Sequence, residues 1–372
     1  MVDLQTQYER LKQEIDAAVL DVMASTRFIG GPQVDGFKEE LEEYLGVKHV
    51  ITCANGTDAL QIAMMALGLK PGDEVIVPTF TYVATAEVIA LLGLTPVMVD
   101  VDEETFCIDL KQVEEAIGPK TKAIVPVHLY GQCADMEGLM NLVEGKGIHV
   151  IEDNAQAIGS DYHYSDGRVV KSGTIGTFGC TSFFPSKNLG CFGDGGALFT
   201  NDDELAIQAK MIASHGQSKQ YVHDVVGCNS RLDAIQAAVL RIKLRKLDDF
   251  AARRRTVADK YDQAFADVEE IITPVRNKRS THVFHQYTML LNGVNRDGMK
   301  EFLAENDVPS MIYYPIPLHE QKAFVDSDSN RGFPVTQTLC RMVISLPIHT
   351  EMESEQPDYI IHKVTEYIRT SK

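Results

Sequence analysis

The sequence lacks any Cys-x-x-Cys pair. Its seven cysteines stand singly at positions 53, 107, 133, 180, 191, 228 and 340. An odd number of scattered cysteines indicates neither a disulfide framework nor a zinc knuckle. We therefore expect free thiols and a reducing compartment.

Long apolar runs are also missing. No stretch of about 18 apolar residues occurs, and the first nine residues (MVDLQTQYE) are polar. The sequence thus offers neither a membrane-spanning helix nor an export signal. We expect a cytoplasmic protein that does not bind membranes.

Positive charge is scarce. The chain has 35 Lys and Arg against 53 Asp and Glu, for a formal net charge of -18. Such a chain repels a phosphate backbone at long range, so nucleic acid is not an expected partner. An anionic small molecule would need a local cluster of donors.

The composition is that of a globular protein, with 372 residues, 44% hydrophobic and 24% charged. At roughly 100 to 200 residues per domain, two or three folded units are expected. From about residue 47 to 201, short apolar runs alternate with helix-like segments, which predicts an α/β fold with a largely parallel sheet. The runs are His49–Ala54, Glu74–Phe80, Pro96–Val101, Ala123–Leu129, His149–Asp153, Thr177–Phe184 and Gly196–Thr200.

The remainder of the chain has a different pattern. Ser230–Arg255 has helical periodicity without Gly or Pro and predicts one long helix leading out of the first domain. We expect a large domain over 1–245 and a smaller α+β domain over 246–372. In the smaller one we expect strands at Val283–Leu291 and Met342–Leu346, a helix at Arg296–Asn306, a polar loop at Asp326–Gly332 and a C-terminal helix.

The carboxyl ends of the predicted strands carry polar residues, and ligands of open α/β sheets bind there. The first strand ends in Asn55, Gly56 and Thr57 and opens a helix. Small residues at a helix start allow backbone N–H groups to bind an anion such as phosphate. Simple helix capping by Asn55 or Thr57 is the equally weighted alternative.

The fifth strand ends in two acids, Glu152 and Asp153. A carboxylate buried at the end of a core strand requires a partner, so Asp153 should meet a cationic group. That group could be an arginine or lysine, or a protonated ring nitrogen.

Lys187 follows the sixth strand, five residues after the hydroxyl of Ser182. Partial desolvation there would lower its pKa toward the neutral amine that forms a Schiff base. A lone lysine would more simply be an exposed loop amine. Together with the anion site and Asp153, however, Lys187 completes the set that pyridoxal phosphate requires: phosphate donors, an acid for the ring nitrogen and a lysine for the aldehyde.

At this point the sequence resembles the DegT/DnrJ/EryC1/StrS sugar-nucleotide aminotransferases. The order and spacing of seven segments along nearly the whole chain carry the resemblance. They are Asn55–Leu60, Gly72–Ile76, Glu152–Gln156, Ser182–Lys187, Gly195–Gly196, His215–Gly216 and Asn229–Asp233. The resemblance implies the fold of type I pyridoxal-phosphate enzymes: a large domain with a mixed, mostly parallel seven-stranded sheet, and a smaller C-terminal α+β domain.

The resemblance also implies roles for individual residues. Lys187 would bind the cofactor aldehyde and shuttle the proton, and Asp153 would face the pyridinium nitrogen. The other implied cofactor contacts are Gln156 at the ring hydroxyl, Tyr82 on the ring face, and Gly56, Thr57 and Ser182 at the phosphate. Asn229 would reach the phosphate from a neighbouring subunit, which implies a homodimer with shared active sites.

The implied reaction moves an amino group from L-glutamate to a ketosugar nucleotide. The subgroup that the chain most resembles aminates C3 of a UDP-linked 2-acetamido-2-deoxy-3-keto-hexuronic acid for O-antigen and other surface polysaccharides. Arg231 would clamp the substrate carboxylate, although it could instead pair with Asp233. Tyr313 and Tyr314 are further substrate candidates, and Tyr313 departs from the histidine of close relatives.

Other functions stay open. A neutral dTDP- or UDP-linked ketosugar, aminated at C3 or C4, is the alternative substrate. A dehydratase of this family would carry histidine in place of Lys187, and a regulatory or structural member would typically lose Lys187 or Asp153.

Two further patterns have structural interpretations. His282 and His285 should lie on opposite faces of a strand, so no metal site is expected there. The glycines of Gly190–Gly196 lack a phosphate-loop ending and are expected to allow close packing.

Overall fold

The computed structural model describes residues 1–324 and 332–370. Residues 326–331 of the predicted polar loop therefore lie outside the described residues.

Within this part of the chain, seven strands form the main sheet in the order β1-β9-β8-β5-β4-β2-β3. Neighbouring strands are parallel from β8 to β3, whereas β9 is antiparallel to both β8 and β1. The predicted mixed, mostly parallel sheet is confirmed. The strands are His49–Cys53 (β1), Glu74–Pro78 (β2), Thr95–Val99 (β3), Thr121–Ile124 (β4), His149–Asp153 (β5), Phe178–Ser182 (β8) and Gly196–Thr200 (β9).

Several predicted strands are longer than the observed ones, and β4 is the case with a local chemical reason. The run Ala123–Leu129 was expected to be extended throughout, but β4 ends at Ile124. Pro126 has no N–H to donate to a ladder. Its carbonyl still accepts from Asp153 N at 2.9 Å, so the segment stays beside β5 as it turns away.

Helices cover both faces of the main sheet. Alternate residues of each strand point to opposite sides and are therefore buried against different helices. Val50 packs in a cluster with α2 and α8, while its neighbour Ile51 packs in a cluster with α3, α4 and α7. The helices of this part are Leu4–Ser25 (α1), Pro32–Leu45 (α2), Gly56–Ala66 (α3), Ala84–Leu91 (α4), Leu110–Ala116 (α5), Met136–Val143 (α6), Asp203–Ile212 (α7) and Ala234–Leu244 (α8). Short elements lie between them: Leu129–Gly131 (η1), Asp161–His163 (β6), Val169–Lys171 (β7), Gln217–Lys219 (β10) and Val222–His223 (β11).

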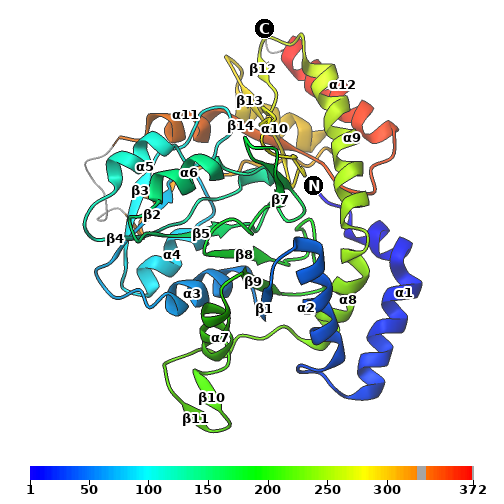
Figure 1. Cartoon of the computed structure of the whole chain (residues 1–372). Coiled ribbons are helices and arrows are strands. Elements are labelled where there is room, and N and C mark those ends of the chain that lie inside the picture. The colour runs from blue at the N-terminus through cyan, green and yellow to red at the C-terminus, as the bar shows by residue number, and fades with distance from the viewer. Residues whose placement is uncertain (325–331, 371–372) are drawn as a thin grey trace.

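The N-terminal helix α1 packs against α8, far along the chain, as Figure 1 shows. Leu11 and Ile15 of α1 bury their side chains against Val239 and Ile242 of α8. The start of the chain is thus held by a helix that follows the whole main sheet.

The predicted long helix Ser230–Arg255 is wrong, because two helices occupy this region. After α8 ends at Leu244, α9 runs over Leu247–Phe265, and Lys246 between them has a φ of -111° and a ψ of 1°. Arg241 and Lys243 in the last turn of α8, followed by acids in the first turn of α9, suit a helix end and a helix start. This change from basic to acidic residues is the feature of the sequence that could have predicted the break between the two helices.

Helix α9 leads from the main sheet to a smaller α+β unit (Figure 1). The elements of this unit are Ile271–Ile272 (β12), Tyr287–Leu291 (β13), Arg296–Glu305 (α10), Leu318–Glu320 (η2), Pro334–Met342 (α11), Val343–Leu346 (β14) and Glu355–Thr370 (α12). Residues of both units share one further apolar cluster, in which Phe80 and Tyr130 meet Leu290 and Val343. The exact division at 245/246 stays a prediction.

Among the helices of the described residues, none combines the length and the apolar character needed to cross a bilayer.

Candidate active site

A cavity of about 870 Å³ lies at the carboxyl edge of the main sheet. Elements far apart in the sequence meet there: the starts of α3 and α4, the ends of β5 and β8, and the segment Met311–Tyr314. Nine predicted site residues line it, namely Gly56, Thr57, Tyr82, Asp153, Gln156, Ser182, Lys187, Tyr313 and Tyr314.

The start of α3 is built for close approach. A Cβ on Gly56 would lie 2.7 Å from Ser182 Cβ, so only glycine fits between α3 and β8. Asn55 caps the helix, because its Oδ1 accepts from Asp58 N at 2.8 Å. The capping interpretation is therefore correct for Asn55. The first N–H groups of a helix have no partner within the helix, so capping leaves an anion site possible at Gly56 and Thr57.

The glycines after Lys187 serve close packing, as predicted. A Cβ on Gly190 would lie 2.3 Å from Pro185 O, and one on Gly196 would lie 2.3 Å from Asn55 O. Gly196 thereby lets β9 pack directly against the residue that caps α3.

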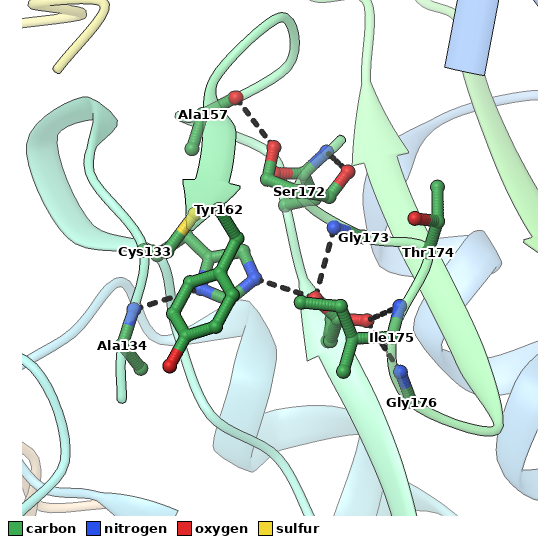
Figure 2. Close-up of polar contacts among 12 residues, drawn as sticks. Cys133, Ala134, Ala157, Tyr162, Ser172, Gly173, Thr174, Ile175 and Gly176 are labelled. Atoms are coloured by element: carbon green, nitrogen blue, oxygen red, sulfur yellow. Dashed lines mark hydrogen bonds and ion pairs between the residues drawn. The ribbon is translucent and has the colours of Figure 1, made fainter. Parts of the chain in front are cut away.

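The first of the two acids ending β5, Glu152, is saturated by hydrogen bonds. Its carboxylate accepts from the backbone N–H groups of Gly173, Ile175 and Gly176 at 2.6 to 2.8 Å. These three donors belong to one short loop, which Figure 2 labels. His128 Nε2 lies 2.8 Å from the same carboxylate. Because His128 Nδ1 accepts from Ala134 N, we assign the ring proton to Nε2. Glu152 is fully buried and has a structural role.

Asp153 is bound differently and faces the cavity. Its side chain is 8% exposed. Thr85 Oγ1 donates to Asp153 Oδ2 at 2.9 Å, and Ala155 N donates to Oδ1 at 3.2 Å. No lysine or arginine of the described ranges forms an ion pair with it. The predicted cationic partner of Asp153 is therefore not an ion-paired lysine or arginine of the described residues.

Lys187 lies just after β8 and its side chain is half-buried in the cavity wall. Burial lowers the pKa of the amine from 10.5 to about 8, and the negative charge of Asp153 partly opposes this shift. The alternative of an exposed loop amine is wrong. An amine with this pKa is neutral in a substantial fraction of molecules near pH 8, as a nucleophile or base requires.

Gln156 connects the cavity to two tyrosines. Its Oε1 accepts from Tyr130 N at 2.7 Å, and its Nε2 donates to the Tyr314 hydroxyl at 3.2 Å. Burial raises the pKa of Tyr314, so this phenol stays protonated. The ring of Tyr82 lies 6.4 Å from that of Tyr314 and is 58% exposed, which leaves a face free toward the cavity.

Asn229 and Arg231 lie outside the cavity of their own chain, and both are exposed. In the described residues Arg231 forms no ion pair with Asp233, the suggested alternative. The exposure of Asn229 is compatible with a contact in another subunit. The roles of both residues stay predictions.

Sequence reasoning missed several residues of the site. His285 lines the cavity, and its Nδ1 lies 3.2 Å from Oδ1 of Asn188, the neighbour of Lys187. Burial, together with the charges of Lys187 and Arg254, holds its pKa well below 6.5. The expected strand position of His282 and His285 is wrong, because β13 begins only at Tyr287. No local pattern signals a contact between residues almost a hundred positions apart.

Two buried polar atoms of the cavity wall have no hydrogen-bond partner in the described part of the chain. They are Thr81 Oγ1 and Gln286 Oε1, on side chains that are 3% and 7% exposed. Buried polar groups without a protein partner are uncommon and favour a site that binds a ligand.

Known proteins resemble this chain over almost its full length. A UDP-2-acetamido-2-deoxy-3-oxo-D-glucuronate aminotransferase of Pseudomonas aeruginosa is 46% identical, covering 95% of this chain and 96% of the relative. A UDP-N-acetyl-3-dehydro-alpha-D-glucosamine 3-aminotransferase of Acidithiobacillus ferrooxidans is 44% identical, covering 96% and 94%. A pleiotropic regulatory protein of Geobacillus stearothermophilus is 45% identical, covering 99% and 98%.

Solved structures agree with these relatives. The chain superposes on S. venezuelae DesV, solved in complex with a ketimine intermediate, with a TM-score of 0.94, 40% identity and coverage of 99% and 97%. It superposes on ntda from Bacillus subtilis, solved with bound cofactor PMP, with a TM-score of 0.89, 31% identity and coverage of 96% and 82%. The profile of the DegT/DnrJ/EryC1/StrS aminotransferase family matches residues 9–365. With the fold, the cavity and the full-length relatives in agreement, this chain belongs to the DegT/DnrJ/EryC1/StrS aminotransferase family.

Proposed function

We propose that the protein is a pyridoxal-phosphate-dependent aminotransferase of nucleotide-linked ketosugars. One observation carries the proposal: a lysine of lowered pKa, Lys187, lines the same cavity as Asp153, a carboxylate that forms no ion pair with a lysine or arginine of the described residues. The alternative of a regulator, suggested by the name of the Geobacillus relative, has no comparable support, because both residues are present.

The residues of the cavity fit the cofactor. The start of α3, with Gly56 packed against Ser182, offers N–H groups for its phosphate. Asp153 offers an anion to its ring nitrogen, and Tyr82 offers an aromatic face. The unpartnered hydroxyl of Thr81 is a further polar contact within the same cavity.

Bound pyridoxal phosphate supplies an electron sink for the carbon that loses its proton. The chain's own residues do the remaining work. Lys187 would hold the cofactor aldehyde, and its amine would serve as the base that moves the α-proton. Asp153 would keep the ring nitrogen protonated. Gln156, whose amide donates to the Tyr314 hydroxyl, would orient the ring hydroxyl.

L-Glutamate is the proposed amino donor, and the proposed acceptor is a UDP-linked 2-acetamido-2-deoxy-3-keto-hexuronic acid of surface polysaccharide (O-antigen) synthesis. The name of the Pseudomonas relative supports the acid. The name of the Acidithiobacillus relative, whose sugar has no carboxylate, supports a neutral UDP-linked 3-keto sugar as the second candidate. A coupled assay with a panel of ketosugar nucleotides decides between them.

Arg231 provides a sharper test of the acid. If it clamps the hexuronate carboxylate, the acid should be preferred over the matched neutral sugar by about 10- to 150-fold in kcat/KM, the range of a charge-assisted bidentate pair. Arg231→Lys should remove much of this preference, because an ammonium lacks the planar fork. The matched control is Arg245→Lys, at an exposed arginine 3.5 Å from Glu14. Equal efficiency on both sugars would reject the hexuronate.

A homodimer with shared active sites is also proposed. Large apolar side chains are exposed around the segment that carries Asn229: Tyr221 and Val226 are 84% and 85% exposed, and Phe28 and Ile29 lie beside Asp233. Exposed apolar groups gathered in one region favour a protein interface. The seven free cysteines support the proposed cytoplasmic location.

Mixing two variants with different defects tests the shared site. Asn229→Ala should weaken cofactor retention, and Lys187→Met should abolish turnover. In a mixed dimer both defects fall in one site, which leaves the other site intact, so activity should return toward half of that of the wild-type dimer. Differently tagged protomers report subunit exchange. Exchange without recovery of activity would contradict the role of Asn229 across the interface.

A further inference from the structure

The carboxylate of Asp153 accepts a hydrogen bond from Thr85, a residue that does not line the cavity. Thr85 is fully buried, and its hydroxyl donates to Asp153 Oδ2 at 2.9 Å. It makes no contact with the space where ligands bind. Any effect of this hydroxyl on the reaction must therefore pass through the carboxylate.

Thr85 lies in the first turn of α4, and a predicted cofactor contact, Tyr82, stands just before this helix. Tyr82 O accepts from Thr85 N at 3.4 Å, so the two residues belong to one turn of the chain. Tyr82 faces the cavity, and the hydroxyl of Thr85 reaches β5. This single turn thus links the aromatic face of the site to its acid.

Within the part of the chain that the structure describes, the carboxylate of Asp153 accepts from two donors. Ala155 N donates to Oδ1 at 3.2 Å, and Thr85 donates to Oδ2. The χ2 torsion of aspartate is broad, so the carboxylate plane is set by its hydrogen bonds. Without the hydroxyl, the longer bond from Ala155 alone would hold that plane. Glu152 next to it, with four donors, has no such dependence on one side chain.

We propose that Thr85 is a positioning residue that orients the Asp153 carboxylate toward the ring nitrogen of pyridoxal phosphate. The inference rests on the proposed cofactor chemistry. It predicts that loss of the hydroxyl weakens the recognition of the ring nitrogen specifically and leaves recognition of the phosphate and the aldehyde unchanged.

The test compares two ligands of the cofactor-free full-length protein. One is pyridoxal 5'-phosphate, and the other is 1-deazapyridoxal 5'-phosphate, in which carbon replaces the ring nitrogen. The wild type should bind the first more tightly. In Thr85→Val, which keeps the side-chain shape, this preference should fall by about tenfold, the lower end for a hydrogen bond to a charged group. Thr85→Ser should restore it.

A matched control is Thr181→Val. Thr181 is fully buried one strand away, donates to Asn154 O at 3.3 Å and does not line the cavity. The same exchange of hydroxyl for methyl there should leave the preference between the two ligands at the wild-type value. Thr85→Ala serves as a second variant and should show the same loss of preference if Thr85→Val does not fold.

Three other outcomes would contradict either the role of Thr85 or the proposed role of Asp153. A wild-type preference that persists unchanged in the folded Thr85 variants would overturn the role of Thr85 alone. An equal loss of affinity for both ligands would mean a purely structural role and would overturn it too. A wild type that does not distinguish the two ligands would instead contradict the proposed contact between Asp153 and the ring nitrogen.

Discussion

Replacing Lys187 with methionine is expected to lower the turnover number by about 10⁴-fold or more, because the amine is both the cofactor anchor and the base for the α-proton. Methionine keeps a long side chain and removes the amine, so the variant should still fold and bind pyridoxal phosphate. Turnover is measured with L-glutamate and the preferred ketosugar nucleotide. Borohydride reduction of the wild-type holoenzyme should attach the cofactor to the peptide that contains Lys187.

Lys243 offers a matched control within the same chain. It is also buried, burial likewise lowers its pKa to about 8, and its ammonium lies 4.7 Å from the ring centre of Phe192. Unlike Lys187, it does not line the cavity. Lys243→Met should therefore keep its turnover, and borohydride should not label this residue. Full activity of Lys187→Met, or labelling at Lys243, would show that a lowered pKa alone had been mistaken for function.

Asp153→Asn is expected to lower the rate of the half-reaction with L-glutamate by about 10³-fold, because a neutral amide does not keep the ring nitrogen protonated. The fold should remain intact, since Asp153 contributes no ion pair to it among the described residues. Stopped-flow absorbance measures the half-reaction, and thermal unfolding measures the stability.

For the adjacent acid, Glu152, we expect a loss of stability rather than a loss of rate. Glu152→Gln places an NH₂ group or an uncharged oxygen against three backbone N–H donors and should lower the free energy of unfolding by about 2 kcal/mol. The rate of the folded variant should change less than tenfold. If Asp153→Asn lost less than tenfold in rate, or Glu152→Gln lost as much as Asp153→Asn, the assignment of separate roles to the two acids would be wrong.

The sheet could be predicted because each strand is a short apolar run whose two faces are both buried, and such runs stand out without any knowledge of the partners. The ends of elements were less accessible. Pro126 ended β4 early, and the junction at Lys246 divided the predicted long helix. In both places local chemistry, a missing N–H and a reversal of charge, outweighed a continuous hydrophobic pattern.

In the site, the residues that directly follow strands could be predicted, and Lys187 and Asp153 do line one cavity. The different roles of Glu152 and Asp153 could not be predicted. They depend on hydrogen bonds from the loop that contains Gly173 and from Thr85 in α4. His285 was missed for the same reason. Contacts between distant segments leave no trace in the spacing of residues.

The pairing of β1 with β9 has a consequence for synthesis of the chain. Cys53 pairs with Gly196, and α1 rests on α8, which ends at Leu244. A ribosome that adds about 5 to 20 residues per second needs roughly 10 to 40 s to travel from the end of β1 to the end of α8. During that time the first strand and the apolar side of α1 emerge without their partners. The segment from α1 to β1 is thus synthesised well before the segments that bury it, and a nascent-chain chaperone would protect it during that interval.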